Sequence, residues 1–505
     1  MKPTWKRRQR NMSAGKKKLE QNKEAVDRYL RERQITYAEA VANDYGLEFL
    51  EYLINEGIAD DFANAMYKKK REFISNYEVF PMIYMMNILS GEWAVRRTQK
   101  ILKNEAVLRV LGFTEEEIDN GLTQRGAKNQ YGEGFSRKSG IMASTTVIDN
   151  LACFDYEGLE ECFNRYIRRV SRNGLVDFGE IYIMDSSIVE TAKDYPGAKP
   201  VRRRNEEGEE TDEVVWGFKV FILSSARTLT PVAIHITTAN DADSPMLLEM
   251  VRRGVANLGE GKIKVVLADR GFIDGQQMYR LKYGMGIDFV IPARKNMEIW
   301  KCMTGLRSDN KNNVEEWRYG KKGLSGGYLS KGSVSYAQYA EESAGDKKDR
   351  NGSPINAVVV TRWRDKEIAP GKEKVILTSL DTNSATKVIG LYGQRSLIEN
   401  RNFRELKQAA ALDSLPQYVN KNAEKTARIH MLLCVFMLAV FNTLVETVYA
   451  NPAYAKERIP KNIREFRFMK DCKKAKMFVL VKHYYYIYDM EEFLIYAGFT
   501  FVPRD

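Results

Sequence analysis

Two aspartates stand at the ends of two predicted strands and could bind a metal ion together. The first strand covers residues 179–185 and ends in Asp185, and the second covers residues 262–269 and ends in Asp269. Ligands gather at the carboxyl ends of strands in α/β sheets. If the two strands are neighbours, the carboxylates converge and repel unless a proton or a cation lies between them. A hard divalent cation such as Mg²⁺ fits that need; the alternative is that each Asp caps the turn after its strand.

A segment further along the chain carries a tyrosine, an arginine and a glutamate at helical spacing. Tyr392 lies seven residues before Glu399, and Arg395 lies four residues before it. At about 100° per residue, these three side chains share one face of a helix. On that face the arginine would grip phosphate oxygens and the glutamate would ligate a metal ion. The alternative is a solvent-facing pair between Arg395 and Glu399 at i,i+4 spacing.

These motifs resemble those of the DDE transposases of bacterial insertion sequences, in the group with a Tyr-Arg-Glu-Lys signature on its last catalytic helix. The matching segments are Ile181–Ser187, Gly217–Ile222, Ala239–Ser244, Val265–Phe272 and Tyr392–Lys407. The resemblance implies an α/β protein whose RNase H-like catalytic core, a mixed sheet flanked by helices, is interrupted by a β-rich insertion. The long interval between Asp269 and Glu399 has room for that insertion. No motif of this family covers the first 170 residues or so.

The resemblance also implies roles for the motif residues. Asp185, Asp269 and Glu399 would be the catalytic, metal-binding triad, and Tyr392 and Arg395 would contact phosphates of the transposon end. The expected cofactor is Mg²⁺ or Mn²⁺, with two ions in each active site. Two ions about 3.5–4 Å apart can assist phosphodiester cleavage without a protein nucleophile. Asp185 would bridge both ions, and Asp269 and Glu399 would each hold one.

The signature lysine is the point where this sequence departs from the family. The family usually places that lysine seven residues after the glutamate, whereas Lys407 lies eight residues after Glu399 and Leu406 occupies the usual position. On a regular α-helix, Lys407 would lie about 80° round from Glu399. Its flexible stem could still bring the ammonium to the DNA backbone, and we therefore keep Lys407 as a DNA contact.

Further polar residues flank the motifs. Arg270 follows Asp269 directly, and it either contacts DNA or supports the turn. Arg294 and Lys295 follow a strand that should end at the same edge of the sheet, which makes both of them candidate phosphate contacts. Asp243 aligns with a family acid, but its place before a predicted helix favours a capping role over catalysis.

The predicted function is that of a DNA transposase that cleaves the ends of an insertion sequence and joins them to a target. Its partners would be double-stranded DNA, as terminal inverted repeats and target, and a second copy of the chain in a synaptic complex. We expect a cytoplasmic, nucleoid-associated protein of a bacterium or archaeon. The alternatives are a metal-dependent nuclease of the same fold that does not join DNA, and a catalytically inactive, domesticated DNA-binding protein.

The elements that would position these residues fall into six regions along the chain. They differ in texture, with helical periodicity before residue 175 or so and β-prone segments after it. The expected regions are a basic N-terminal arm (1–18), a helical DNA-binding region (19–175), the first part of the catalytic core (176–296), a β-rich insertion (297–380), the second part of the core with the glutamate helix (381–450) and a C-terminal region (451–505).

The composition agrees with this interpretation but does not carry it. The chain has 505 residues, and its 79 Lys and Arg exceed its 67 Asp and Glu to leave a formal net charge of +12. That excess favours a polyanionic partner without naming one. The five cysteines and three histidines lack ligand spacing, so no zinc site or disulfide framework is expected. The most apolar stretch, Met431–Val445, is shorter than the ~20 residues that span a bilayer and predicts a buried helix.

Overall fold

The structure is a computed structural model, and the chain divides into two compact units. Ile167–Arg404 form one, called here the sheet unit, and Met1–Tyr166 with Glu405–Asp505 form the other, called here the helical unit. The expected basic arm, residues 1–18, lies outside the described residues. The residues described are 19–41, 45–67, 76–91, 98–122, 140–204, 210–309, 314–319, 324–341, 352–363, 366–381, 385–416, 422–449, 459–471 and 476–498.

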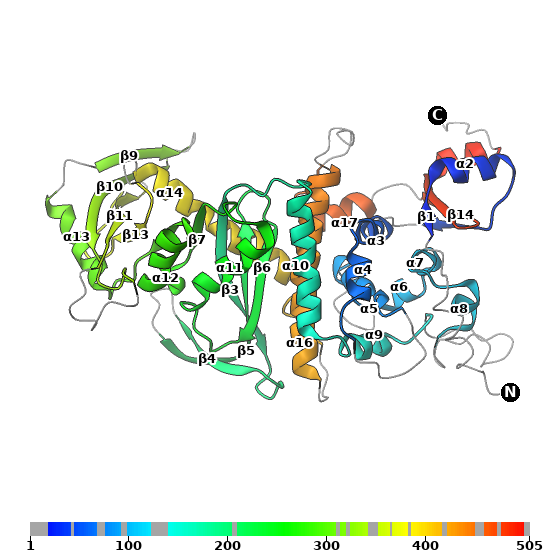
Figure 1. The fold of residues 1–505 in the computed structure, drawn as a ribbon, viewed down its shortest axis with the longest axis horizontal. Helices are drawn as coiled ribbons and strands as arrows, with labels where there is room; N and C mark the ends of the chain where they lie inside the picture. The colour runs from blue at the N-terminus through cyan, green and yellow to red at the C-terminus, as the bar shows by residue number, and fades with distance from the viewer. Residues whose placement is uncertain are drawn as a thin grey trace. The chain divides into compact units, whose positions relative to one another are not determined.

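The sheet unit is built on one large mixed sheet (Figure 1). Its core strands are β3 (Ile181–Thr191), β4 (Lys199–Arg204), β5 (Glu210–Ser225), β6 (Pro231–Thr238), β7 (Val265–Ala268) and β8 (Asp288–Pro292). β5 pairs antiparallel with β3, β4 and β6, whereas β3, β7 and β8 run parallel to one another. The predicted strands are therefore present, and the core is the mixed sheet flanked by helices that the sequence led us to expect.

The β-rich segment after β8 extends this same sheet. Its strands are β9 (Val314–Tyr319), β10 (Leu324–Ser335), β11 (Pro354–Trp363), β12 (Lys366–Glu367) and β13 (Lys374–Thr378). β13 pairs antiparallel with β8, and the order continues through β11 and β10 to β9. Strand β13, which the sequence analysis assigned to the insertion, thus lies next to the core strand β8.

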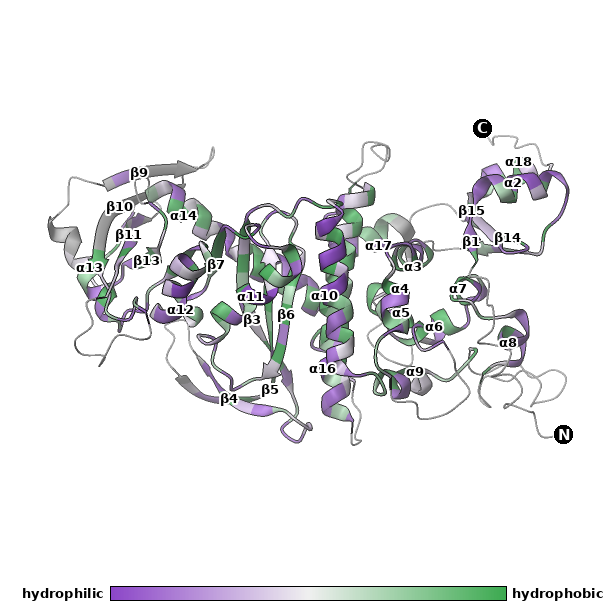
Figure 2. Cartoon of the chain, viewed as in Figure 1, coloured by the Kyte–Doolittle hydropathy of each residue, from purple (hydrophilic) through white to green (hydrophobic). Residues whose placement is uncertain are grey.

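Helices and tight turns cover the sheet and follow its strands. They are α11 (Met246–Leu258), η3 (Arg270–Phe272), α12 (Gly275–Tyr279), η4 (Arg280–Gly284), α13 (Glu298–Asp309), α14 (Ala385–Gln394) and η5 (Ile398–Phe403). α11 packs on β5 and β6, α14 packs along β7 to β11, and η5 contacts β3. The strands are apolar enough to need this cover, and Figure 2 shows β3 and β6 largely in the hydrophobic colour.

The helical unit contains most of the remaining helices. They are α2 (Lys23–Arg31), α3 (Tyr45–Asn55), α4 (Ile58–Ala63), α5 (Val79–Leu89), α6 (Gln99–Leu102), α7 (Glu105–Val110), α8 (Glu115–Asn120), α9 (Ser144–Leu151), α10 (Tyr156–Arg172, which runs on into the sheet unit), α15 (Arg404–Gln408), α16 (Ala423–Leu444), η6 (Val445–Tyr449), α17 (Ile463–Asp471) and α18 (Met490–Tyr496). α16 forms the centre of this unit, where the Phe436 ring contacts Phe62, Phe163 and Tyr166.

α16 is longer than the apolar stretch in the sequence indicates. It continues through η6, and together they form the one helix in the described part of the chain that is long and apolar enough to cross a membrane. Most of that helix is buried inside the helical unit. The sequence-based length was wrong because Glu424, Lys425 and Arg428 interrupt the apolar run without ending the helix. Burial accounts for its apolar character, since a helix that is apolar all round belongs in a core.

A small sheet joins the two ends of the described chain within the helical unit. β1 (Glu20–Gln21) and β2 (Tyr37–Val41) pair with β15 (Tyr484–Asp489) and β14 (Lys476–Val481), in the order β1-β15-β14-β2. Val26 and Leu30 of α2 pack against Val479 and Tyr488. Helical periodicity did not predict β1 and β2, because their partners lie more than 400 residues away in the sequence.

Candidate active site

The strands that carry the two aspartates are neighbours in the sheet, but only Asp269 follows the end of its strand. The prediction that the first strand ends in Asp185 was wrong, because β3 keeps pairing with β5 beyond Asp185 as far as Thr191. β3 and β7 run parallel with Met184 opposite Ala268, so that Asp185 and Asp269 follow next in the same register. The side chain of Asp185 is buried, and Asp269 is partly buried where it precedes the turn η3. The condition for the metal hypothesis, that these strands be adjacent, is therefore met.

A single arginine links the glutamate helix to the first aspartate. Arg395 Nη1 lies 2.8 Å from Glu399 Oε1 and 3.4 Å from Asp185 Oδ2. The i,i+4 pair that the sequence allowed as an alternative is thus present. Glu399 is half exposed to solvent, but the side chain of Arg395 is only 14% exposed and also reaches a carboxylate on the sheet. Residues 210 positions apart in the sequence are brought together here.

Burial makes ionisation of Asp185 unfavourable. Loss of solvent raises the pKa of this carboxyl group to about 7, and the nearby Arg395 guanidinium opposes that rise. The backbone N–H of Ser186, which donates to Asp185 Oδ1 at 2.8 Å, also opposes it. The carboxylates of Glu399 and Asp269 raise the pKa of Asp185 further. The three acids therefore interact electrostatically, and a cation would relieve their repulsion.

Tyr392 and a lysine that the sequence analysis missed lie beside this cluster. Lys374, the first residue of β13, places Nζ 4.4 Å from the centre of the Tyr392 ring, and Arg395 Cζ lies 5.8 Å from the same ring. Desolvation lowers the pKa of Lys374 although much of its side chain is exposed, and the charge of Arg395 lowers it further. Asp269 and Glu399 oppose that shift. No motif marks Lys374, because only the pairing of β13 with β8 brings it here.

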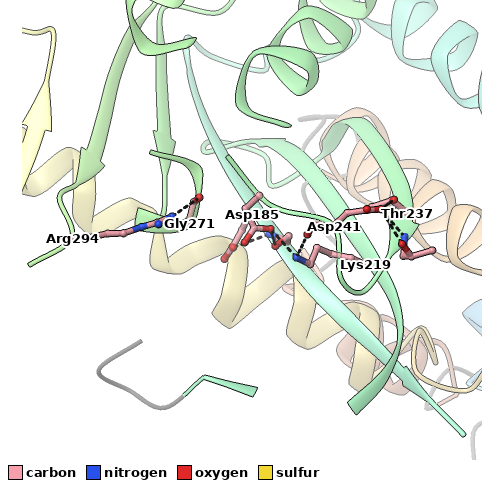
Figure 3. Close-up of polar contacts among 9 residues, drawn as sticks. Asp185, Lys219, Thr237, Asp241, Gly271 and Arg294 are labelled. Atoms are coloured by element: carbon pink, nitrogen blue, oxygen red, sulfur yellow. Dashed lines mark hydrogen bonds and ion pairs between the residues drawn. The ribbon is translucent and has the colours of Figure 1, made fainter. Parts of the chain in front are cut away.

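The turn after Asp269 is held by an arginine from the neighbouring strand. Arg294 donates from Nε to the carbonyl oxygen of Arg270 at 3.0 Å and from Nη2 to that of Gly271 at 3.1 Å (Figure 3). Its guanidinium is thus engaged with the protein backbone, which the sequence did not indicate. Lys295 is exposed, and the side chain of Arg270 is partly buried. The DNA contacts expected for these three residues stay predictions.

Asp243 does not cap the helix that follows it. The N-cap of α11 is Pro245, whose side chain makes no capping hydrogen bond, and in the first turn the N–H of Leu248 donates to Gln277 Oε1 at 2.9 Å. Asp243 Oδ1 instead accepts a hydrogen bond from Ser186 Oγ at 2.9 Å and lies 3.3 Å from Lys219 Nζ. The capping prediction was therefore wrong, because the chain turns at Asp243 and directs its carboxylate toward β3 and β5 rather than toward the helix end.

A π-helical turn changes the meaning of the lysine spacing. η5 (Ile398–Phe403) is π-helical and continues directly into α15, which holds Lys407. A π-helical turn closes with an i→i+5 hydrogen bond and so contains one residue more than an α-helical turn. A spacing of eight residues across this turn therefore corresponds to seven residues in a regular α-helix. The offset of about 80° expected for Lys407 assumed a regular α-helix, which this segment is not. Lys407 Nζ lies 3.5 Å from Asp413 Oδ1 in the helical unit.

The donor set at the cluster suits a hard divalent cation. Carboxylate oxygens of Asp185, Asp269 and Glu399 are the ligand type that Mg²⁺ and Mn²⁺ prefer. Within the described ranges, no three acidic, His or Cys side chains are already gathered closely enough to hold an ion as they stand. Arg395 lies against both Asp185 and Glu399, and its positive charge partly balances these acids. The residue types therefore fit a metal ion, provided that the guanidinium gives way.

Comparison with known proteins places a family on this region of the chain. Residues 177–438 match the family described as "Transposase DDE domain". No curated protein matches the chain. Among solved structures, a cryo-EM structure of the piggyBac transposase synaptic complex with hairpin DNA is similar at a TM-score of 0.44 and 9% sequence identity, covering 86% of this chain and 82% of that one. A TM-score this low adds no support to an assignment of fold or function for this chain.

Proposed function

The chain belongs to the transposase DDE domain family, and on that premise we propose that it cuts the ends of an insertion sequence and joins them to target DNA. The substrates would be terminal inverted repeats and a target duplex. Two ends must be brought together, so the working form would be a homodimer in a synaptic complex. The proposed setting is the nucleoid of a bacterial or archaeal cytoplasm.

The alignment of Asp185 with Asp269 at one edge of the sheet is the observation that carries this proposal. The two strands present their acids in one register, and Glu399 reaches the same edge through Arg395. In an α/β sheet, that edge is where ligands bind. Carboxylates that repel one another can share this position if a cation binds between them during the reaction.

We assign Asp185, Asp269 and Glu399 as the ligands of two Mg²⁺ or Mn²⁺ ions. When bound, such ions supply an activated water and stabilise the leaving oxygen of a phosphodiester. The acids hold their positions through protein contacts, with the Ser186 N–H on Asp185 and the turn η3 after Asp269. Burial of Asp185 keeps bulk water away from that side of the site.

Arg395 is proposed to exchange its carboxylate partners for a DNA phosphate. In this structure its guanidinium pairs with Asp185 and Glu399. Planar guanidinium groups bind phosphate oxygens in a bidentate fashion, so an incoming phosphate can compete for the same donors. Tyr392 and Lys374 flank Arg395 and would contact the same stretch of DNA backbone. This exchange would free both acids for metal binding as DNA arrives.

Cleavage and joining of DNA from the flanks of the gene test the proposal. Linear DNA that carries these flanks, with any inverted repeats they contain, is incubated with the protein and Mg²⁺ or Mn²⁺. Strand transfer is measured separately with a pre-cut 3′-OH end. We expect end-specific cleavage and joining that disappear with EDTA. Asp185→Ala, Asp269→Ala and Glu399→Ala should each abolish cleavage and leave DNA binding largely intact.

Asp288→Ala provides the matched control. Asp288 pairs with Lys282 at 2.6 Å and stands at the start of β8, at the end of the sheet opposite to Asp269. Cleavage by this variant should equal that of the wild type. Unchanged cleavage in any triad variant would remove that residue from the triad. Cleavage without joining would indicate a nuclease, and metal-independent DNA binding without cleavage would indicate a domesticated binding protein.

A further inference from the structure

A buried lysine stands on the strand next to the first catalytic strand. Lys219 of β5 is 8% exposed, and its Nζ donates to the carbonyl oxygen of Asp241 at 2.6 Å and lies 3.3 Å from Asp243 Oδ1. Figure 3 shows Lys219 reaching Asp241 on one side of Asp185, with Arg294 and Gly271 on the other. Burying an ammonium group is costly unless it is paired and hydrogen-bonded. Lys219 is thus buried beside the carboxylate cluster in spite of the free-energy cost of burying its ammonium group.

The loop that Lys219 contacts is itself fixed. Asp241 accepts hydrogen bonds from the backbone N–H of Thr238, at 3.2 Å, and from the hydroxyl of Thr237. This turn follows the end of β6 at Thr238 and leads to Asp243. Lys219 therefore contacts this loop at two points, the backbone carbonyl of Asp241 and the carboxylate of Asp243. Together these contacts fix the position of the Asp243 carboxylate.

A short series of contacts leads from Lys219 to Asp185. Asp243 Oδ1 accepts from Ser186 Oγ at 2.9 Å, and the Ser186 N–H donates to Asp185 Oδ1 at 2.8 Å. Lys219 lies opposite Ile188 in the β3–β5 register, and Ser186 lies two residues earlier on the same face of β3. Successive residues of a strand point to opposite faces, so Ser186 anchors β3 from the face that Asp185 does not use.

The same carboxylate also abuts the turn that follows Asp269. A Cβ atom on Gly271 would lie 3.0 Å from Asp243 Oδ2, which is tighter than ordinary contacts. Asp243 thus packs directly on the backbone of the turn that begins at Asp269 and contacts β3 through Ser186, the residue after Asp185. One carboxylate, that of Asp243, therefore contacts the residue after Asp185 and the turn after Asp269.

We infer that Lys219 and Asp243 are positioning residues that fix the spacing between Asp185 and Asp269. The inference rests on the proposed function, because it assigns this spacing to metal binding. Lys219 orients Asp243, and Asp243 holds Ser186 and the turn at Gly271, so that the two aspartates keep their register when their charges repel. Partners of this kind commonly change metal affinity or activity by about 10- to 100-fold when removed.

Direct measurement of Mn²⁺ binding tests the inference without relying on DNA cleavage. Electron paramagnetic resonance of free Mn²⁺, titrated into the full-length protein, gives the dissociation constant. We expect Lys219→Met and Ser186→Ala each to weaken Mn²⁺ binding by about tenfold or more, at an unchanged melting temperature in metal-free buffer. Because both act through Asp243, the double variant should weaken it by no more than the larger single effect.

Lys282→Met is the matched control, since it also breaks a Lys–Asp pair, at the opposite end of the strands. It should bind Mn²⁺ as the wild type does. Ser186→Ala is a small change that is compatible with folding even if Lys219→Met fails to fold. If Ser186→Ala binds Mn²⁺ with wild-type affinity, the inference is overturned while the proposed function stands. Equal weakening by Lys282→Met would also overturn the inference. A wild-type protein that binds no Mn²⁺ would overturn the proposed function and this inference together.

Discussion

Two buried titratable side chains, one in each unit, meet the loss of solvent in opposite ways. His430 in α16 is 3% exposed, and burial lowers its pKa to about 4. Its Nε2 lies 3.0 Å from the carbonyl oxygen of Ala411, and its Nδ1 lies 2.7 Å from the Tyr84 hydroxyl. Because a carbonyl can only accept, Nε2 carries the proton and Nδ1 accepts from Tyr84. The imidazole is neutral, and both its nitrogens are satisfied.

Asp185 has the same depth of burial but a different set of neighbours. Burial raises its pKa to about 7, and two further acids, Glu399 and Asp269, raise it more, with Arg395 as the opposing cation. The hydrogen bonds of His430 are complete within the protein, whereas the charged groups that act on Asp185 are two acids and one guanidinium. A buried titratable group whose hydrogen-bond partners lie within the protein stabilises the fold, whereas a buried group whose ionisation is opposed by its neighbours is a candidate for ligand binding.

Removing an acid from the Asp185 site should give the largest effect, and it should lower the rate of DNA cleavage without lowering stability. We expect Glu399→Gln to slow single-turnover DNA cleavage with Mg²⁺ by about a thousandfold or more, equivalent to about 4 kcal/mol of activation free energy. The free energy of unfolding should change little, because half of the Glu399 side chain is exposed. Glu424→Gln, which breaks the i,i+4 pair with Arg428, is the control and should cleave normally. Equal loss in both variants would contradict the comparison.

The complete site should respond to pH through stability. The folded protein keeps His430 neutral down to about pH 4, whereas the unfolded chain protonates it near pH 6.5, so the unfolded state binds more protons in that window. The free energy of unfolding should therefore fall as pH drops from about 6.5 to about 4, by on the order of 3 kcal/mol. Denaturant unfolding at several pH values should show a shallower fall in His430→Gln. The same fall in both proteins would contradict this role.

Arg294 separates support of the site from contact with DNA. Replacement by Met removes two hydrogen bonds to the turn after Asp269. If Arg294 supports that turn, cleavage should slow by about 10- to 100-fold while the affinity for end DNA stays the same. Cleavage kinetics and a fluorescence binding assay, run on Arg294→Met and on Lys295→Met, distinguish the roles. Weaker DNA binding with normal cleavage of saturated substrate would favour the DNA contact that the sequence suggested.

The smallest expected effect lies at the complete site. Tyr84→Phe removes the hydroxyl that donates to His430 Nδ1 and should lower the free energy of unfolding by about 1 kcal/mol, because one buried hydrogen bond is lost. Cleavage per folded molecule should not change. Urea unfolding followed by the cleavage assay checks both statements. A large loss of cleavage at preserved stability would show that the two sites are not separate in function.

The sequence predicted the parts of the site that local patterns mark. Asp185 and Asp269 each follow an apolar run, and Tyr392, Arg395 and Glu399 recur at helical spacing, so both groups could be found without a structure. Lys374, Ser186 and the backbone contacts of Arg294 could not, because each depends on which strands are neighbours. The misassigned cap at Asp243 has the same cause.

Irregular local geometry and long-range pairing explain the remaining differences. The π-helical turn η5 leaves no mark in the residue pattern, and it breaks the regular α-helical spacing from which the role of Lys407 was judged. The strands β1 and β2 form because the far end of the chain pairs with them. Most strands of the catalytic core were easier to predict, since they have an apolar run, which β4 (Lys199–Arg204) lacks.

Anomalous X-ray scattering from Mn²⁺ in crystals of the protein with cleaved end DNA tests the central claim most directly. The metal scatters anomalously, so its position is found without prior assumptions about the ligands. We predict two peaks bounded by the carboxylates of Asp185, Asp269 and Glu399, with the Arg395 guanidinium on a DNA phosphate. Peaks elsewhere, or a complex with cleaved DNA in which Arg395 still pairs with Asp185 and Glu399 and no Mn²⁺ lies between the acids, would contradict the account.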